Sequence, residues 1–126
     1  MQRRKLSSLF ALAALALGGA CLSPTLPLPP PEEPTAIELL GDGETWSIRG
    51  RAAEGAQVIV LNEATGRGVV FEDRDRAGIY SVELPATACD LASVSIVLDG
   101  EASGSTSFVI QERQGGVDVD PSTCAP

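Results

Sequence analysis

The stretch "TWSIRGRAAEGAQVIVLN", residues 45–62, decides the fold. It opens with alternating apolar and polar residues, which put Trp46 and Ile48 on one face of an extended chain. A turn containing glycine and alanine follows, and then every residue from 58 to 61 is apolar. Period-two alternation around a turn predicts two β-strands. Because the second run is apolar on both faces, we expect it to be a central strand covered on both sides.

Further runs with the same alternation occur on both sides of this stretch and are separated by glycine and aspartate turns. They are "AIELL" (36–40), "GVVFED" (68–73), "IYSVELP" (79–85), "SVSIVLDG" (93–100) and "STSFVIQE" (105–112). Seven short strands within residues 35–113 predict a small, all-β, antiparallel sandwich. The tail, residues 114–126, is polar and is expected to be irregular.

Two segments carry a family resemblance. "IRGRAAEGAQVIVLN" and "DRAGIYSVELP" resemble the bacterial Ig-like domains of exported and surface proteins, over about residues 36–112. The matching positions are Ile48, Gly50, Ala52, Gly55, Ala56, Val58 and Val60, then Asp75, Gly78, Tyr80, Val82, Leu84 and Pro85. After Leu-Pro this chain continues with "ATACDLAS" rather than the Gly-x-Tyr of many members. The resemblance implies an Ig-like sandwich used as a spacer, adhesive or interaction module, with no catalytic residues.

The first 20 residues have the pattern of a secretory signal peptide. A basic start (residues 3–5) precedes an uncharged core (residues 9–17) and three small residues (18–20). This order is typical of export signals, and the core is shorter than the ~20 residues that a transmembrane helix needs. A buried helix or a short membrane anchor is the alternative.

Cys21 follows directly. The segment "LGGAC" resembles the lipobox of bacterial lipoproteins, in which the signal is cleaved before the cysteine and the thiol receives diacylglycerol. The resemblance implies a lipidated Cys21 that anchors the chain to a membrane through acyl chains such as palmitate, and Leu22 favours the outer membrane by the same analogy. The family prefers Leu where this chain has Gly18. The alternative is ordinary cleavage at the same bond, which leaves Cys21 as a free exported thiol.

Residues 21–34 read as a linker. Six of the nine prolines lie in residues 22–34. Such a segment favours polyproline II at ~3.1 Å per residue, so thirteen residues would span roughly 40 Å. We expect a spacer between Cys21 and the domain. A tail without a spacing role is the alternative.

Charge and composition exclude several functions. Removal of residues 1–20 lowers the basic residues from 9 to 6 and leaves 17 acidic ones, so the formal net charge changes from −8 to −11. Such an acidic chain is repelled by nucleic acid and by anionic lipid head groups, so surface charge is not expected to hold it on a membrane. Solubility is the preferred interpretation of the charge. The chain has no histidine, the commonest general base and transition-metal ligand. We therefore expect no enzyme activity and no cofactor.

Cys89 and Cys124 are the other two cysteines. Exported proteins meet an oxidising compartment, where two cysteines usually pair. Counting alternating strand directions returns the tail to the end of the sandwich where Cys89 lies. We predict a disulfide worth roughly 3–4 kcal/mol. Two free thiols, or a metal pair that lacks its other ligands, are the alternatives.

Asp73 and Asp75 form a weak Ca²⁺ candidate in "EDRDRAG". The segment lacks the further oxygen ligands and the glycine placement of a calcium loop, so a plain turn is the preferred interpretation. No metal site is expected.

Two classes of function remain. The first is a non-catalytic, membrane-anchored surface lipoprotein whose domain contacts an unknown protein or surface polymer. The second is a small-ligand or ion-binding sandwich that uses the loops at one end. Alternating strand directions place loops 41–44, 63–67 and 85–92 together, away from the anchor. An exposed aromatic or a carboxylate cluster in these loops would favour ligand binding. A charged surface without either feature would favour the interaction or structural module.

Overall fold

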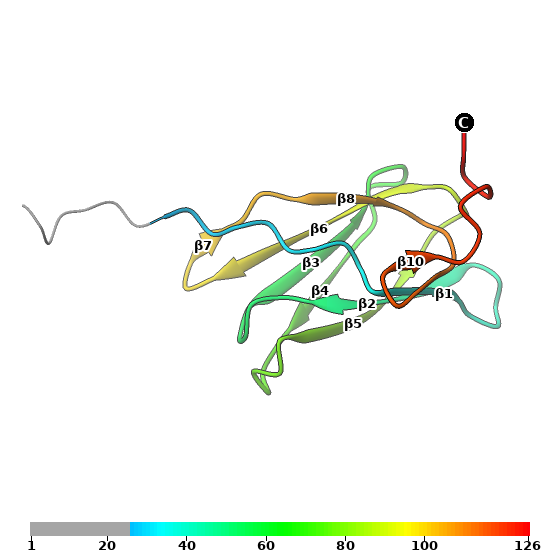
Figure 1. Ribbon diagram of the computed structural model, residues 1–126. Helices are drawn as coiled ribbons and strands as arrows, with labels where there is room; N and C mark the ends of the chain where they lie inside the picture. The colour runs from blue at the N-terminus through cyan, green and yellow to red at the C-terminus, as the bar shows by residue number, and fades with distance from the viewer. Residues whose placement is uncertain (1–25) are drawn as a thin grey trace, which may run out of the picture.

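The computed structural model describes residues 26–126, which form an all-β sandwich of two antiparallel sheets (Figure 1). The predicted fold class is confirmed. The expected signal peptide (1–20) and Cys21 lie outside the described residues.

The first sheet has the order β10-β9-β1-β2-β5. Its strands are β1 (Ala36–Leu39), β2 (Thr45–Arg51), β5 (Ile79–Pro85), β9 (Arg113–Gln114) and β10 (Val117–Asp118). The second sheet has the order β4-β3-β6, and both β7 and β8 pair with the remaining edge of β6. Its strands are β3 (Gln57–Asn62), β4 (Gly68–Glu72), β6 (Leu91–Leu98), β7 (Glu101–Ala102) and β8 (Thr106–Val109). All seven expected strands are present, and β7, β9 and β10 are short additions.

The C-terminal tail is more regular than its composition suggests. β9 and β10 form a hairpin that extends the first sheet through the pairing of Ile37 with Arg113. Gly115 and Gly116 make the two-residue turn with φ of 58° and 78°, the positive values that a tight hairpin turn requires. The expected boundary between residues 113 and 114 therefore falls inside β9, and the tail expected to be irregular begins with strand structure.

Side chains that alternate along the strands fill one core between the sheets. Trp46, Ile48, Val58, Val60, Tyr80, Val82, Leu84, Val94, Ile96, Phe108 and Ile110 are all buried there. The prediction that β3 is covered on both sides is wrong. The strand is central in its sheet, but Ile59 and Leu61 are only half-buried, because no further layer of the described chain covers that outer face.

A close contact in the first sheet joins Gly50 on β2 to Tyr80, its cross-strand partner on β5. A Cβ atom at position 50 would lie 2.5 Å from the Tyr80 hydroxyl oxygen and 2.6 Å from its Cζ. Glycine therefore lets the tyrosine ring lie directly over the neighbouring backbone, as aromatic residues do when they cover a strand glycine. The Tyr80 hydroxyl is buried and has no hydrogen-bond partner among the described residues.

Burial raises the pKa of the Tyr80 phenol well above its ordinary value, because the charged form would lose its hydration. We expect the tyrosine absorbance to stay that of the neutral phenol in the folded protein above pH ~10, where an exposed tyrosine ionises. The unfolded chain loses this proton first, so stability falls as the pH rises past that value. Tyr80 is the only tyrosine, so an alkaline titration followed by ultraviolet absorbance reports it directly. Ionisation near pH ~10 without unfolding would contradict its burial.

The proline-rich segment is not a free spacer along its whole length. Pro31 and Pro34 are buried, and Leu28 packs against the core. The Thr106 hydroxyl donates to the Pro31 carbonyl, and Arg113 Nε donates to the Pro34 carbonyl at 2.8 Å. The spacer expected over 22–34 therefore contacts the sandwich at Leu28, Pro31 and Pro34, because these apolar side chains gain from burial there.

Candidate functional site

The three loops expected at one end of the sandwich do lie together. Loops 41–44, 63–67 and 85–92 are at the end opposite to the start of the described chain (Figure 1). The backbone N–H of Ala86 donates to the Glu44 carbonyl at 3.1 Å. The indole N–H of Trp46 donates to the Ala86 carbonyl, also at 3.1 Å. These two bonds fix the first loop against the third. We call this end the tip.

Asn62 links loop 63–67 to loop 85–92, a role that was not predicted from the sequence. It is fully buried at the end of β3. Its Nδ2 donates to the Pro85 carbonyl at 3.3 Å and to the Asp90 carboxylate at 3.0 Å, and its Oδ1 accepts from the Ala64 N–H at 3.0 Å. A buried amide with both ends satisfied holds a loop in one conformation. The available signal was an asparagine at the boundary between an apolar strand and a turn.

The two aspartates of the tip, Asp42 and Asp90, are bonded by neighbouring loop groups. Asp42 accepts from the Thr45 hydroxyl at 2.7 Å and from two backbone N–H groups. These bonds, the Thr45 hydroxyl first, hold the pKa of Asp42 below its ordinary value. The N–H of Thr87 and then the Asn62 amide likewise lower the pKa of Asp90. Within residues 26–126 no three potential metal ligands cluster. These two aspartates therefore brace turns.

An open hollow of about 530 Å³ lies between the three loops. Its lining includes Leu39, Trp46, Thr65, Arg67, Pro85 and Thr87. Trp46 is its only aromatic residue and is 5% exposed, whereas Leu39 is 41% exposed. Among the described residues, the tip thus shows neither an exposed aromatic nor a carboxylate cluster. Its chemistry is that of a contact surface with mixed charge.

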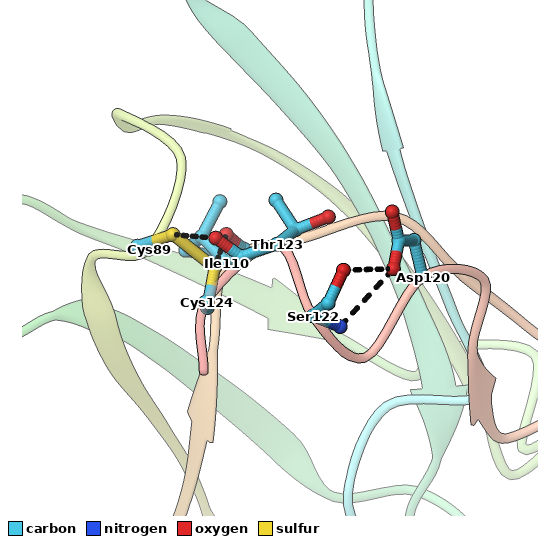
Figure 2. Close-up of a disulfide and its surroundings, with 6 residues drawn as sticks. All are labelled: Cys89, Ile110, Asp120, Ser122, Thr123 and Cys124. Atoms are coloured by element: carbon cyan, nitrogen blue, oxygen red, sulfur yellow. Dashed lines mark hydrogen bonds between the residues drawn. A yellow bond between two sulfur atoms is a disulfide. The ribbon is translucent and has the colours of Figure 1, made fainter. Parts of the chain in front are cut away.

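Cys89 and Cys124 meet beside the tip as a disulfide (Figure 2), with an S–S distance of 2.14 Å and a Cα–Cα distance of 5.3 Å. Cys89 is fixed by its N–H, which donates to the Ile110 carbonyl at 2.6 Å. On the tail side, Asp120 accepts from the hydroxyl and N–H of Ser122 (Figure 2). The structure therefore brings together the pair that strand counting suggested.

Asp73 and Asp75 lie at the other end of the sandwich, between β4 and β5. The Asp73 carboxylate accepts from the N–H groups of Gly55, Ala77 and Gly78 at 3.0, 3.0 and 2.8 Å. The Gly55 bond and then the Gly78 bond hold the pKa of Asp73 below its ordinary value. Asp73 thus fastens its own loop to the β2–β3 loop, while Asp75 is exposed. The bonds of Asp73 are those of a residue that stabilises a turn, and its carboxylate is already engaged by backbone N–H groups.

Replacing Asp73 with alanine is expected to lower the melting temperature by several degrees, because three backbone donors lose one acceptor. Asp75→Ala, two residues away, is the matched control and should leave the melting temperature almost unchanged. Because the folded pKa of Asp73 is depressed, its contribution exists above the unfolded pKa of ~3.9 and is lost as the pH falls through the folded value. Melting curves at neutral and acidic pH measure this. Equal effects of the two variants at neutral pH would contradict the assignment.

No family model, curated protein or solved structure matches this chain. The Ig-like and lipobox resemblances therefore stay predictions, while the β-sandwich itself stands on the strands and their pairing. Across residues 26–126 there is also no helix with the length and apolar character needed to span a membrane.

Proposed function

We propose that the protein is a non-catalytic, membrane-anchored surface lipoprotein whose Ig-like sandwich serves as an interaction or structural module. The observation that carries this proposal is the order "LGGAC", proline-rich segment and sandwich, with the tip loops at the far end. Lipidation of Cys21 would turn that order into an anchor, a tether and a presented surface. By analogy with lipoprotein sorting, Leu22 points to the outer membrane.

The tether in this proposal is shorter than the proline content suggests. Residues 28–34 lie on the sandwich, so residues 22–27 are what separates the domain from the anchor. Six extended residues span roughly 19 Å. The domain would therefore sit close to the membrane, with loops 41–44 and 63–67 directed outward. The acidic charge of the mature chain makes acyl chains, rather than surface charge, the source of membrane affinity.

The tip supports contact rather than catalysis. Asp42 and Asp90 already accept hydrogen bonds from neighbouring residues, and both ends of the buried Asn62 amide are paired. A second candidate function, binding of a small ligand, is favoured by one observation, the open hollow of about 530 Å³ between the loops. Of the residues that the structure describes, only two with charged side chains, Glu44 and Arg67, line that hollow, and its one aromatic residue, Trp46, is buried. The interaction module is therefore the better-supported function.

Cell fractionation tests the anchor. We expect the wild-type chain in the membrane fraction and the detergent phase, and the Cys21→Ser chain in the soluble fraction, since a single residue carries the acyl chains. The double variant Cys89→Ser/Cys124→Ser is the control and should fractionate like wild type, because it keeps Cys21. A Cys21→Ser chain that is retained in membranes as strongly as wild type would refute the proposal.

A further inference from the structure

A second hollow, of about 340 Å³, lies on the side of the sandwich where β8 faces β1 and β9. Ile37 and Phe108 contribute buried apolar surface to it, and Gln111, Arg113, Asp118 and Glu33 contribute polar groups. We call it the β8 hollow. Loops 41–44 and 63–67 do not line it, and the tip loop 85–92 reaches it only through Leu91, where β6 begins. The β8 hollow is therefore distinct from the hollow at the tip, with which it shares no lining residue.

Gln111 is the unusual residue of the β8 hollow. The side chain is 9% exposed, and its Oε1 is buried without a hydrogen-bond partner among residues 26–126. Leaving such an acceptor unpaired costs free energy, because it has lost its hydration without gaining a protein partner. Asn62, the other buried amide, has all of its contacts made by the protein. An unpaired buried carbonyl that lines a hollow calls for an N–H donor from outside.

The backbone beside the hollow is also unpaired. β8 lies at the edge of the second sheet, and β6 is its only strand partner in the described part of the chain. The N–H of Ile110 donates to the Asp90 carbonyl, on the side of β6. In an antiparallel pair, the backbone groups of every second residue point to the partner strand. The N–H and C=O groups of Ser107 and Val109 therefore point away from β6. Such an edge is a template for pairing with another extended chain.

The proline-rich segment does not use this edge. It lies beside the start of β8, where Pro31 accepts from the Thr106 hydroxyl. Residues 29–31 are all proline and have no N–H to donate to a strand. The edge at Ser107 and Val109 therefore keeps its pairing capacity next to the β8 hollow.

The charges around the β8 hollow favour a cation. Arg113 Nη1 and Nη2 contact Asp118 Oδ1 at 3.0 Å and Glu33 Oε2 at 3.1 Å. Two carboxylates thus share one guanidinium, which leaves a net negative charge and further oxygen lone pairs. The mature chain as a whole is also acidic. Charge complementarity therefore disfavours an acidic side chain and favours an ammonium or guanidinium group, which also supplies the N–H donor that Gln111 lacks.

We propose that the β8 edge binds an extended peptide that carries a lysine or arginine side chain. Its backbone pairs with Ser107 and Val109, and its cationic side chain occupies the β8 hollow and donates to Gln111 Oε1. This recognition mode takes its affinity from main-chain bonds and its specificity from a pocket for one side chain. The site goes beyond the proposed anchoring function and does not depend on lipid attachment.

The test uses the purified full chain carrying Cys21→Ser and a blocked heptapeptide, TVTKTVT, with versions that have glutamate or glutamine in place of the lysine. Nuclear magnetic resonance titration should shift the amide signals of Ser107 and Val109. We expect the lysine peptide to bind about tenfold more tightly than the glutamate peptide. Gln111→Met should weaken binding of the lysine peptide by about tenfold, while Gln57→Met, a glutamine outside the hollow, should not change it.

Further variants separate edge pairing from folding. Ser107→Pro removes an N–H that points away from β6, so the fold should persist while peptide binding is lost. Melting curves confirm that each variant is folded, and Gln111→Met should melt no lower than wild type because it removes no hydrogen bond. The proposal is overturned by equal affinity for the lysine and glutamate peptides, by tighter binding of the glutamine peptide, by shifts at loops 41–44 and 63–67 instead of β8, or by no binding up to about 1 mM.

Discussion

Replacing Cys89 and Cys124 together with serine is expected to lower the free energy of unfolding by roughly 3–4 kcal/mol. The disulfide joins residues 35 apart in sequence, and its loss releases the unfolded chain from that closed loop. For a domain of this size the same change lowers the melting temperature by roughly 15–25 °C. Thermal unfolding followed by circular dichroism measures it.

The reductant dependence is the control for this prediction. Wild-type protein melted in a strong thiol reductant should approach the double variant, and the double variant should not respond to reductant. The β9–β10 hairpin is held to β1 by its own pairing, so we expect the sandwich to remain folded at room temperature in both cases. If the wild-type melting temperature does not depend on reductant, the bond either does not form or does not contribute to stability.

The second large effect is expected from Gly50→Ala. The added methyl group would lie 2.5–2.8 Å from three atoms of the Tyr80 side chain, and that side chain is fully buried. The ring cannot move into open space, so overpacking should cost about 3 kcal/mol. Chemical denaturation of the variant and wild type gives the difference in the free energy of unfolding.

Tyr80→Phe tests whether the Tyr80 hydroxyl causes the clash in the Gly50→Ala variant. It removes the buried hydroxyl that lacks a partner, so alone it should leave stability unchanged or raise it. Combined with Gly50→Ala it should restore part of the loss, because the hydroxyl oxygen is the nearest clashing atom, although Cζ at 2.6 Å remains. A Gly50→Ala chain as stable as wild type would show that the ring does not rest on the β2 backbone.

The strands could be predicted because each buried face repeats every second residue. Ile48, Val58 and Tyr80 lie on the core face that their spacing indicated. The same rule failed for the outer face of β3, since an apolar side chain such as Ile59 is also tolerated where neighbouring strands half-cover it. Alternation reports which residues share a face, and it does not report whether a further layer covers that face.

The proline-rich segment shows a different limit. Its composition disfavours helix and inner strand, and residues 26–34, the described part of the segment, form neither. Composition could not show that Pro31 and Pro34 are buried, because their partners Thr106 and Arg113 are more than 70 residues away in the chain. Packing between distant segments is decided by the fold, and local sequence carries little information about it.

The candidate site was predictable in outline only. Strand direction alone placed loops 41–44 and 63–67 at one end and brought Cys89 near Cys124. The role of Gln111 had no sequence signal, and Asn62 had only its position between an apolar strand and a turn, where a polar residue is usually exposed. What distinguishes the two amides is whether the fold supplies hydrogen-bond partners, which only the three-dimensional structure shows.

The central claim is that Cys21 becomes the lipidated first residue of the mature protein. Intact mass spectrometry of the chain purified from membranes tests it most directly. We predict a polypeptide that begins at Cys21 with the added mass of diacylglycerol and a further acyl chain, and the loss of this species in the Cys21→Ser chain. A mature chain that begins at Cys21 without acyl groups, or one that retains residues 1–20, would contradict the account.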